Sequence, residues 1–165
     1  MEQKDKKEKS VKKDAFETAV KFLAVSPRSE KEVREKLYSK GFHKLEVEEA
    51  IARAKSYRYI DDEAYVNDFV DYCGARYGRK KIEYKLVYEK GIAQNTVTCC
   101  LENKLTDESE LEKAVGMAEK YIRAKRVTEK KDFRKVAAFL YQKGFDGSTI
   151  NAAMNKVADV PEFDD

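Results

Sequence analysis

One six-residue phrase occurs three times in this chain of 165 residues: LYSKGF at 37–42, VYEKGI at 87–92 and LYQKGF at 140–145. Its pattern is an aliphatic residue, tyrosine, any residue, lysine, glycine and a large apolar residue. The glycines stand about 50 residues apart, and self-similarity at such a period is typical of proteins built from one repeated supersecondary unit. The phrase therefore predicts three tandem copies of one unit.

The spacing continues without a gap after each glycine. An aliphatic residue follows six positions later and another ten positions later, which gives the pairs Val47 and Ile51, Val97 and Leu101, and Ile150 and Met154. Residues four apart lie on one face of a helix, so each pair indicates a helix with a buried stripe. We expect the three glycines to end the preceding helices with positive φ: Gly41, Gly91 and Gly144.

Apolar periodicity before each phrase adds two further helices per repeat. Only two prolines and seven glycines interrupt the chain, which favours long helices. We predict an all-α fold of nine helices and no sheet, in three tandem three-helix repeats that resemble helix-turn-helix units. The predicted repeats span 15–60, 61–106 and 107–158, between a charged disordered arm at 1–14 and a loose acidic tail at 159–165.

Several residues are predicted to begin helices. Ser29 with Glu32 and Asp107 with Glu110 have the spacing of a capping box, in which a side chain at each position bonds the backbone at the other. Other predicted N-caps are either Asp61 or Asp62, and Thr128.

The second repeat departs from the register of the others. Leu86 lies five residues before Gly91, whereas Leu37 lies four before Gly41. We expect Val87 to take the core position of the second repeat, and the helix there to be wound or turned differently.

The phrase tyrosines, Tyr38, Tyr88 and Tyr141, each follow a predicted core residue by one position. We expect them at the edge of the core, packed on a neighbouring helix with the hydroxyl at the surface. Stacking on unpaired nucleic-acid bases is the alternative.

Composition argues against an enzyme and against export. The chain has one histidine, His43, and three cysteines without a C-x-x-C spacing, Cys73, Cys99 and Cys100. We therefore expect no catalytic cluster, metal, disulfide or cofactor, with Cys99 and Cys100 as partly buried small residues. No run of about 18 apolar residues and no signal-peptide pattern occurs, so we expect a cytoplasmic protein with no membrane partner.

Basic residues gather in places, although the net charge is only +3. Two groups begin near the end of a repeat's first helix and run into its second: Arg76, Arg79, Lys80, Lys81 and Lys85; and Lys120, Arg123, Lys125, Arg126, Lys130, Lys131, Arg134 and Lys135. A third group is diluted by glutamates: Arg28, Lys31, Arg34 and Lys36. Such groups are either solvated helix faces or a stripe that suits a polyanion or an acidic protein groove.

One junction is more specific than the repeated phrase. YIDDE at 59–63 is followed by Tyr65 and Phe69, and then by Gly78 and RKKI at 79–82. Together with the three lysine-glycine turns, this order resembles the RecX family of bacterial proteins that regulate the recombinase RecA. The resemblance spans about residues 15–157, and the extra residue before Gly91 departs from it.

The resemblance implies an elongated, curved molecule that binds the RecA filament on single-stranded DNA. From the charge pattern we expect the first two basic groups, apart from Lys120, to be the contact residues. It implies inhibition of the ATPase and strand-exchange activities of RecA, and thus a role in recombination, DNA repair and the SOS response. Weak direct DNA binding and a monomeric state complete the expectation. Two alternatives stay open: a helix-turn-helix module whose residues 79–81 contact phosphate, and a repeat scaffold for another partner.

Overall fold

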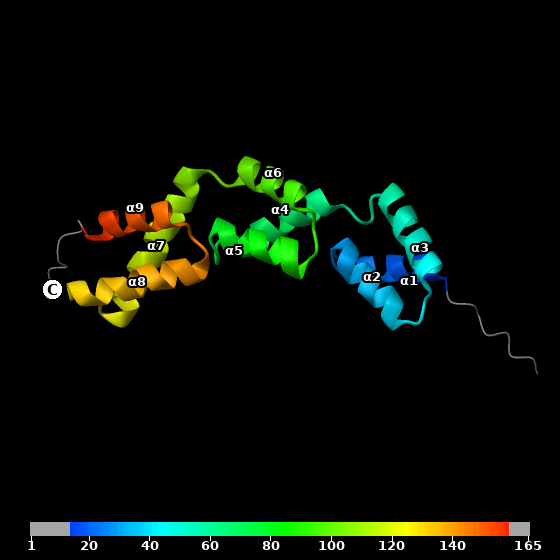
Figure 1. Cartoon of the computed structure of the whole chain (residues 1–165), viewed down its shortest axis with the longest axis horizontal. Helices are drawn as coiled ribbons and strands as arrows, with labels where there is room; N and C mark the ends of the chain where they lie inside the picture. Colours follow the sequence, from blue (N-terminus) through cyan, green and yellow to red (C-terminus); the bar gives the residue numbers. More distant parts are fainter. Residues whose placement is uncertain (1–13, 159–165) are drawn as a thin grey trace, which may run out of the picture. The chain divides into compact units, whose positions relative to one another are not determined.

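The computed structural model describes residues 14–158, apart from the side chains of Lys130 and Lys131 (Figure 1). The chain divides into two compact units, residues 1–61 and 62–165. The first contains α1 (Ala15–Leu23), α2 (Glu30–Ser39) and α3 (Lys44–Ser56). The second contains α4 (Asp62–Cys73), α5 (Arg79–Tyr84), the π-helical turn η1 (Lys85–Glu89), α6 (Gln94–Lys104), α7 (Asp107–Lys125), α8 (Lys130–Lys143) and α9 (Gly147–Ala158).

The described residues thus form nine α-helices and no strand, which confirms the predicted all-α fold of three-helix repeats. Each repeat has its own hydrophobic core, formed by α1–α3, by α4–α6 and by α7–α9. The leucines of the repeated phrase, or next to it, are fully buried in these cores: Leu37, Leu86 and Leu140. The division into residue ranges 15–60, 61–106 and 107–158 stays a prediction.

The glycine turns are as predicted. Gly41, Gly91 and Gly144 have φ of +86°, +71° and +92°, a conformation in which a Cβ atom is strained. The residue after each glycine donates its backbone N–H to the carbonyl of the buried leucine, and the turn thereby satisfies a helix-end acceptor.

The second repeat accommodates its extra residue in η1. The N–H of Ile92 reaches the carbonyl of Leu86, six residues back, whereas Phe42 reaches Leu37, five residues back. Leu86 is fully buried and Val87 only partly. The expectation that the helix is wound differently here is confirmed. The prediction that Val87 takes the core position was wrong, because the π-helical turn absorbs one residue and keeps Leu86 facing inward.

The helix starts are partly as predicted. Ser29 and Glu32 form the expected capping box, with the Ser29 N–H donating to Glu32 at 3.0 Å. The box predicted for Asp107 was wrong, since Thr106 caps α7 by accepting from the N–H of Ser109.

Two further N-cap positions differ from expectation. Glu129 stands at the N-cap position of α8, in place of the predicted Thr128. Asp14, placed in the predicted arm, accepts from the N–H of Phe16 at the start of α1. The rest of that arm and the acidic tail lie outside the described residues.

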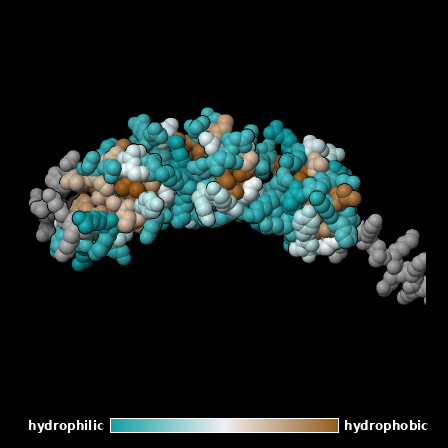
Figure 2. Space-filling view, in the orientation of Figure 1, coloured by the Kyte–Doolittle hydropathy of each residue, from teal (hydrophilic) through white to brown (hydrophobic). Residues whose placement is uncertain are grey.

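The phrase tyrosines are more exposed than an edge-of-core position predicts. Tyr38, Tyr88 and Tyr141 are 44%, 67% and 74% exposed. Cys99 is also exposed, contrary to expectation. Hydrophilic side chains dominate the face seen in Figure 2, with small hydrophobic patches between them. Within the described part of the chain, no helix is long and apolar enough to cross a membrane.

Candidate partner-binding surface

Two helix ends meet backbone to backbone within the second unit. Gly78 precedes α5 and donates its N–H to the Lys143 carbonyl at 2.8 Å, while the N–H of Lys80 donates to the Gly144 carbonyl at 3.1 Å. A Cβ on Gly78 would lie 2.6 Å from the Gly144 carbonyl, and one on Gly144 would lie 2.3 Å from the Lys81 Cβ. The second and third repeats therefore meet through a contact that only glycine permits.

A buried ion pair supports the same junction. Glu110 on α7 is 5% exposed and pairs with Lys113, one helical turn later. The Lys113 ammonium also donates to the carbonyls of Gly74 and Tyr77, at 3.0 and 3.1 Å. These bonds fix the segment between α4 and α5 against α7.

Arg79, one of the residues predicted to contact the partner, bonds to groups within this junction. Its N–H donates to the Glu110 carboxylate at 2.8 Å, and its guanidinium donates to the Leu105 carbonyl. Asp107 lies 3.6 Å from the same guanidinium. The structure thus gives Arg79 a local structural role and leaves Glu110 no part in a capping box.

Basic side chains gather around the Tyr77 ring. The ammonium groups of Lys81, Lys85 and Lys143 lie 5.3, 5.5 and 5.9 Å from its centroid. Lys81 also donates to the Gln142 carbonyl at 3.0 Å, so α5 and α8 both contribute to this positive region. Cations at this distance from a ring are attracted by its negative face.

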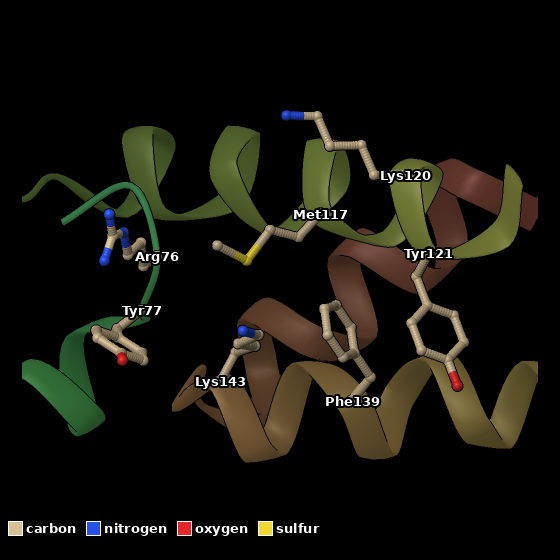
Figure 3. Close-up of a pocket in the computed structure, with 7 residues that line it drawn as sticks. All are labelled: Arg76, Tyr77, Met117, Lys120, Tyr121, Phe139 and Lys143. Atoms are coloured by element: carbon tan, nitrogen blue, oxygen red, sulfur yellow. The ribbon is translucent and has the colours of Figure 1, made fainter. Parts of the chain in front are cut away.

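A pocket of about 340 Å³ opens beside Tyr77 (Figure 3). It has contributions from the segment before α5, from α7 and from α8: Arg76, Tyr77, Met117, Lys120, Tyr121, Phe139 and Lys143. Figure 3 shows Met117 and Phe139 projecting from their two helices into the space between them, with the Lys120 ammonium directed outward. The lining thus combines three rings and a thioether with three cations and no carboxylate.

The other predicted basic residues stay at the surface. Arg76 and Lys80 are exposed, as are five residues on α7, on α8 or between them: Arg123, Lys125, Arg126, Arg134 and Lys135. The Lys135 ammonium donates to the Asp132 carboxylate at 2.7 Å, and this bond raises the pKa of Lys135. Lys130 and Lys131 belong to α8, and their side chains lie outside the description.

The third basic group, in the first unit, is largely paired. Arg34 bonds Glu30 at 2.8 Å and also Glu48, and the bond from Arg34 lowers the pKa of Glu48. Arg28 and Lys36 lie over the Phe22 ring, at 4.9 and 5.3 Å from its centroid. These contacts favour the interpretation of this group as a structural helix face.

Sequence reasoning missed six of the seven pocket residues as site residues: Tyr77, Met117, Lys120, Tyr121, Phe139 and Lys143. Tyr121 and Met117 are four apart on α7, as Phe139 and Lys143 are on α8, so each pair shares a helix face. That spacing was the available signal. Nothing in it indicates which faces meet.

His43 stands exposed at the start of α3, where its N–H donates to Glu46 at 2.9 Å. Among residues 14–158, no three His, Cys, Asp or Glu side chains are placed to hold a metal ion. The described features are thus those of a binding surface, with basic, aromatic and apolar groups together.

Comparison with known proteins gives consistent matches. Residues 15–53 match the family model described as RecX, first three-helix domain, and residues 107–154 match that of the third three-helix domain. The regulatory protein RecX of Clostridioides difficile is 32% identical over 149 residues, covering 88% of this chain and 69% of that protein. The regulatory protein RecX of Caldanaerobacter subterraneus is 30% identical over 144 residues, covering 87% and 70%.

The fold is also found in a solved structure. The crystal structure of RecX from Lactobacillus salivarius superposes with a TM-score of 0.79 at 27% identity, covering 88% of this chain and 96% of that one. Fold and surface thus define a tandem three-helix-repeat protein of the binding, regulatory class. The sequence matches go further, and the chain belongs to the RecX family of regulatory proteins.

Proposed function

We propose that this chain binds the RecA filament on single-stranded DNA and inhibits its ATPase and strand-exchange activities. Membership of the RecX family, which regulates RecA, supports this function. In this proposal the chain acts as a monomer in the cytoplasm and without chemistry of its own.

The observation that carries the proposal is the exposed basic surface of the second unit. Its side chains come from both α7 and α8 and from the segment before α5. They are exposed even where they pair with a carboxylate, as Arg123 does with Glu119 and Lys135 with Asp132. A filament presents phosphate and acidic protein surface, to which such a region is complementary. Each exposed contact contributes only about 0.2–1 kcal/mol, so binding depends on several together.

The helix-turn-helix alternative has less support. It requires residues 79–81 to contact phosphate at the start of α5, but the Arg79 side chain is directed to Leu105 and Asp107. Helix α5 is also only six residues long before the π-helical turn.

The test is the DNA-dependent ATPase of RecA, assembled on single-stranded DNA, with this protein added after filament formation. We expect ATP hydrolysis to fall as protein is added, and strand exchange to fall with it. Unchanged hydrolysis at protein concentrations that saturate the filament would overturn the proposal. Inhibition of an unrelated DNA-dependent ATPase to the same extent would point instead to simple competition for DNA.

A further inference from the structure

We propose that the pocket beside Tyr77 holds one unstacked nucleotide, with its base against the aromatic rings and its phosphate near Arg76 and Lys143. The inference deepens the proposed function, and rests on it for the setting in which a nucleotide is met. Binding itself requires only the pocket. It can therefore be tested without RecA.

The size and chemistry of the pocket fit this ligand. Its volume of about 340 Å³ lies in the range of small-ligand sites, roughly 300–1,000 Å³. Tyr121 and Phe139 have ring centroids 4.7 Å apart, and both are half-buried, so part of each ring remains accessible. Every base offers a flat face for stacking on such rings, whatever its sequence.

The charge of the lining selects an anion. Arg76 and Lys143 contribute two positive charges, the Lys120 ammonium is directed outward, and the lining includes no carboxylate. The Lys143 ammonium lies 5.4 Å from the Phe139 centroid, so a cation stands directly beside a stacking surface. A ligand with both a flat apolar part and a negative part satisfies both features.

The walls are fixed before a ligand arrives. Lys113 holds the carbonyls of Gly74 and Tyr77, and the Gly78 N–H bonds the Lys143 carbonyl at 2.8 Å. A site that is already ordered loses less conformational entropy on binding.

The same bonds argue against an acidic peptide in this pocket. An extended peptide gains much of its affinity from hydrogen bonds to free backbone groups. Here the backbone groups of Gly74, Tyr77 and Gly78 are already bonded within the protein. A nucleotide needs only a ring face and a nearby cation, which the lining offers.

The experiment is a titration of the full chain with a fluorescent thymidine oligonucleotide and with an abasic strand of the same length. The chain has no tryptophan and ten tyrosines, so base stacking can also be followed as quenching of tyrosine emission. We expect the abasic strand to bind at least about fivefold more weakly, because base–aromatic stacking is lost. Equal binding of the two strands would overturn the proposal.

Variants locate the effect. Phe139→Leu keeps an apolar side chain but removes a stacking face, and Tyr77→Leu does so without altering the backbone bonds; each should weaken oligonucleotide binding at least about fivefold. Tyr141→Leu, two residues after Phe139 and 74% exposed, is the matched control and should stay within about twofold. Wild-type affinity in both pocket variants, with helical content unchanged, would overturn the pocket.

Two competitors distinguish the source of the ligand. If thymidine monophosphate displaces the oligonucleotide at the same nucleotide concentration, the ligand of the pocket is a free nucleotide. If it does not, and oligonucleotide binding depends on bases, the ligand is part of a strand. A phenylalanine-containing acidic peptide is also titrated. The proposal would be overturned if Phe139→Leu weakened the binding of this peptide but not the binding of the oligonucleotide. If the protein inhibits RecA but its DNA binding does not depend on bases, only this inference is overturned. If its DNA binding depends on bases but it does not inhibit RecA, only the proposed function is overturned.

Discussion

Two groups of basic side chains, one in each unit, have different surroundings. In the first unit, Arg34 lies between Glu30 and Glu48, and Lys55 pairs with Glu30 at 2.6 Å. In the second unit, Lys81 and Lys143 approach an aromatic ring and their helices end beside a pocket without carboxylates. The comparison teaches that the number of basic residues does not define a binding surface; the placement of the acidic residues around them does.

The two units also differ at their equivalent glycine turns, and this should give the largest effect. Gly41 and Gly144 both have positive φ, but a Cβ on Gly41 meets nothing within 4 Å, whereas one on Gly144 meets Lys81 at 2.3 Å. Gly41→Ala should cost about 1 kcal/mol, from backbone strain alone. Gly144→Ala should cost about 3 kcal/mol or more, since overpacking is added to the same strain.

Urea unfolding followed by circular dichroism measures both glycine variants. Because the backbone conformation is the same at both sites, the difference isolates the inter-repeat contact. Equal costs would mean that the close approach of Gly78 and Gly144 is not maintained in solution.

Glu110 should give the next largest effect. Glu110→Ala leaves the Lys113 ammonium buried without its carboxylate and the Arg79 N–H without its acceptor, and should cost about 2 kcal/mol or more. Glu112→Ala, an exposed change on the same helix, should stay within about 0.5 kcal/mol. If the two variants were equally stable in thermal unfolding, Glu110 would not stabilise the junction.

Charge reversal should separate the two units in function. Arg123→Glu with Lys125→Glu and Arg134→Glu should weaken inhibition of RecA about tenfold or more, since several exposed contacts are lost together. The same change of charge in the first unit, at the exposed residues Lys21, Lys40 and Lys44, should alter it about twofold at most.

Salt sharpens the same comparison. Inhibition by the wild type should weaken as salt is raised, because exposed charges are screened over about 8–10 Å. An equal loss of inhibition in both triple variants would show that the net charge matters and the second unit does not. Arg79 is left intact in this design because it holds the junction.

Features set by neighbours in sequence could be predicted. The glycine turns and the Ser29 capping box depend on residues within about one helical turn, and each was correct. The core residue next to the repeated phrase was predicted wrongly in the second repeat alone, where the winding of the helix changes. A change of winding was expected from the extra residue before Gly91, but the register did not show that Leu86, and not Val87, would be the fully buried residue.

Features set by distant residues could not be predicted. The Arg79 N–H finds its acceptor 31 residues away, and Lys81 bonds a carbonyl 61 residues away. Helical periodicity indicates which residues share a face, but not which face meets which. The sequence therefore predicted the basic groups, while the aromatic pocket between them required the structure.

The smallest predicted effect lies two residues after the glycine in each repeat, where His43 and Asp146 are equivalent. The Ser148 hydroxyl and the Thr149 N–H donate to the Asp146 carboxylate at 2.6 and 2.8 Å, and lower its pKa to about 2. Because the folded pKa lies below the ordinary value of 3.8, this stabilisation is present above about pH 4 and is lost as the pH falls toward 2.

Asp146→Ala should therefore cost about 1 kcal/mol at neutral pH, the usual cost of losing an N-terminal cap. The difference in unfolding free energy between wild type and Asp146→Ala should shrink between about pH 4 and 2, because protonation removes the charge that the two donors stabilise. His43→Ala should change neither stability nor RecA inhibition measurably, because the His43 contact is made by its backbone N–H. A pH-independent difference at Asp146 would assign its effect to neutral hydrogen bonding, and a loss of inhibition in folded His43→Ala would give the only histidine of the chain a functional role.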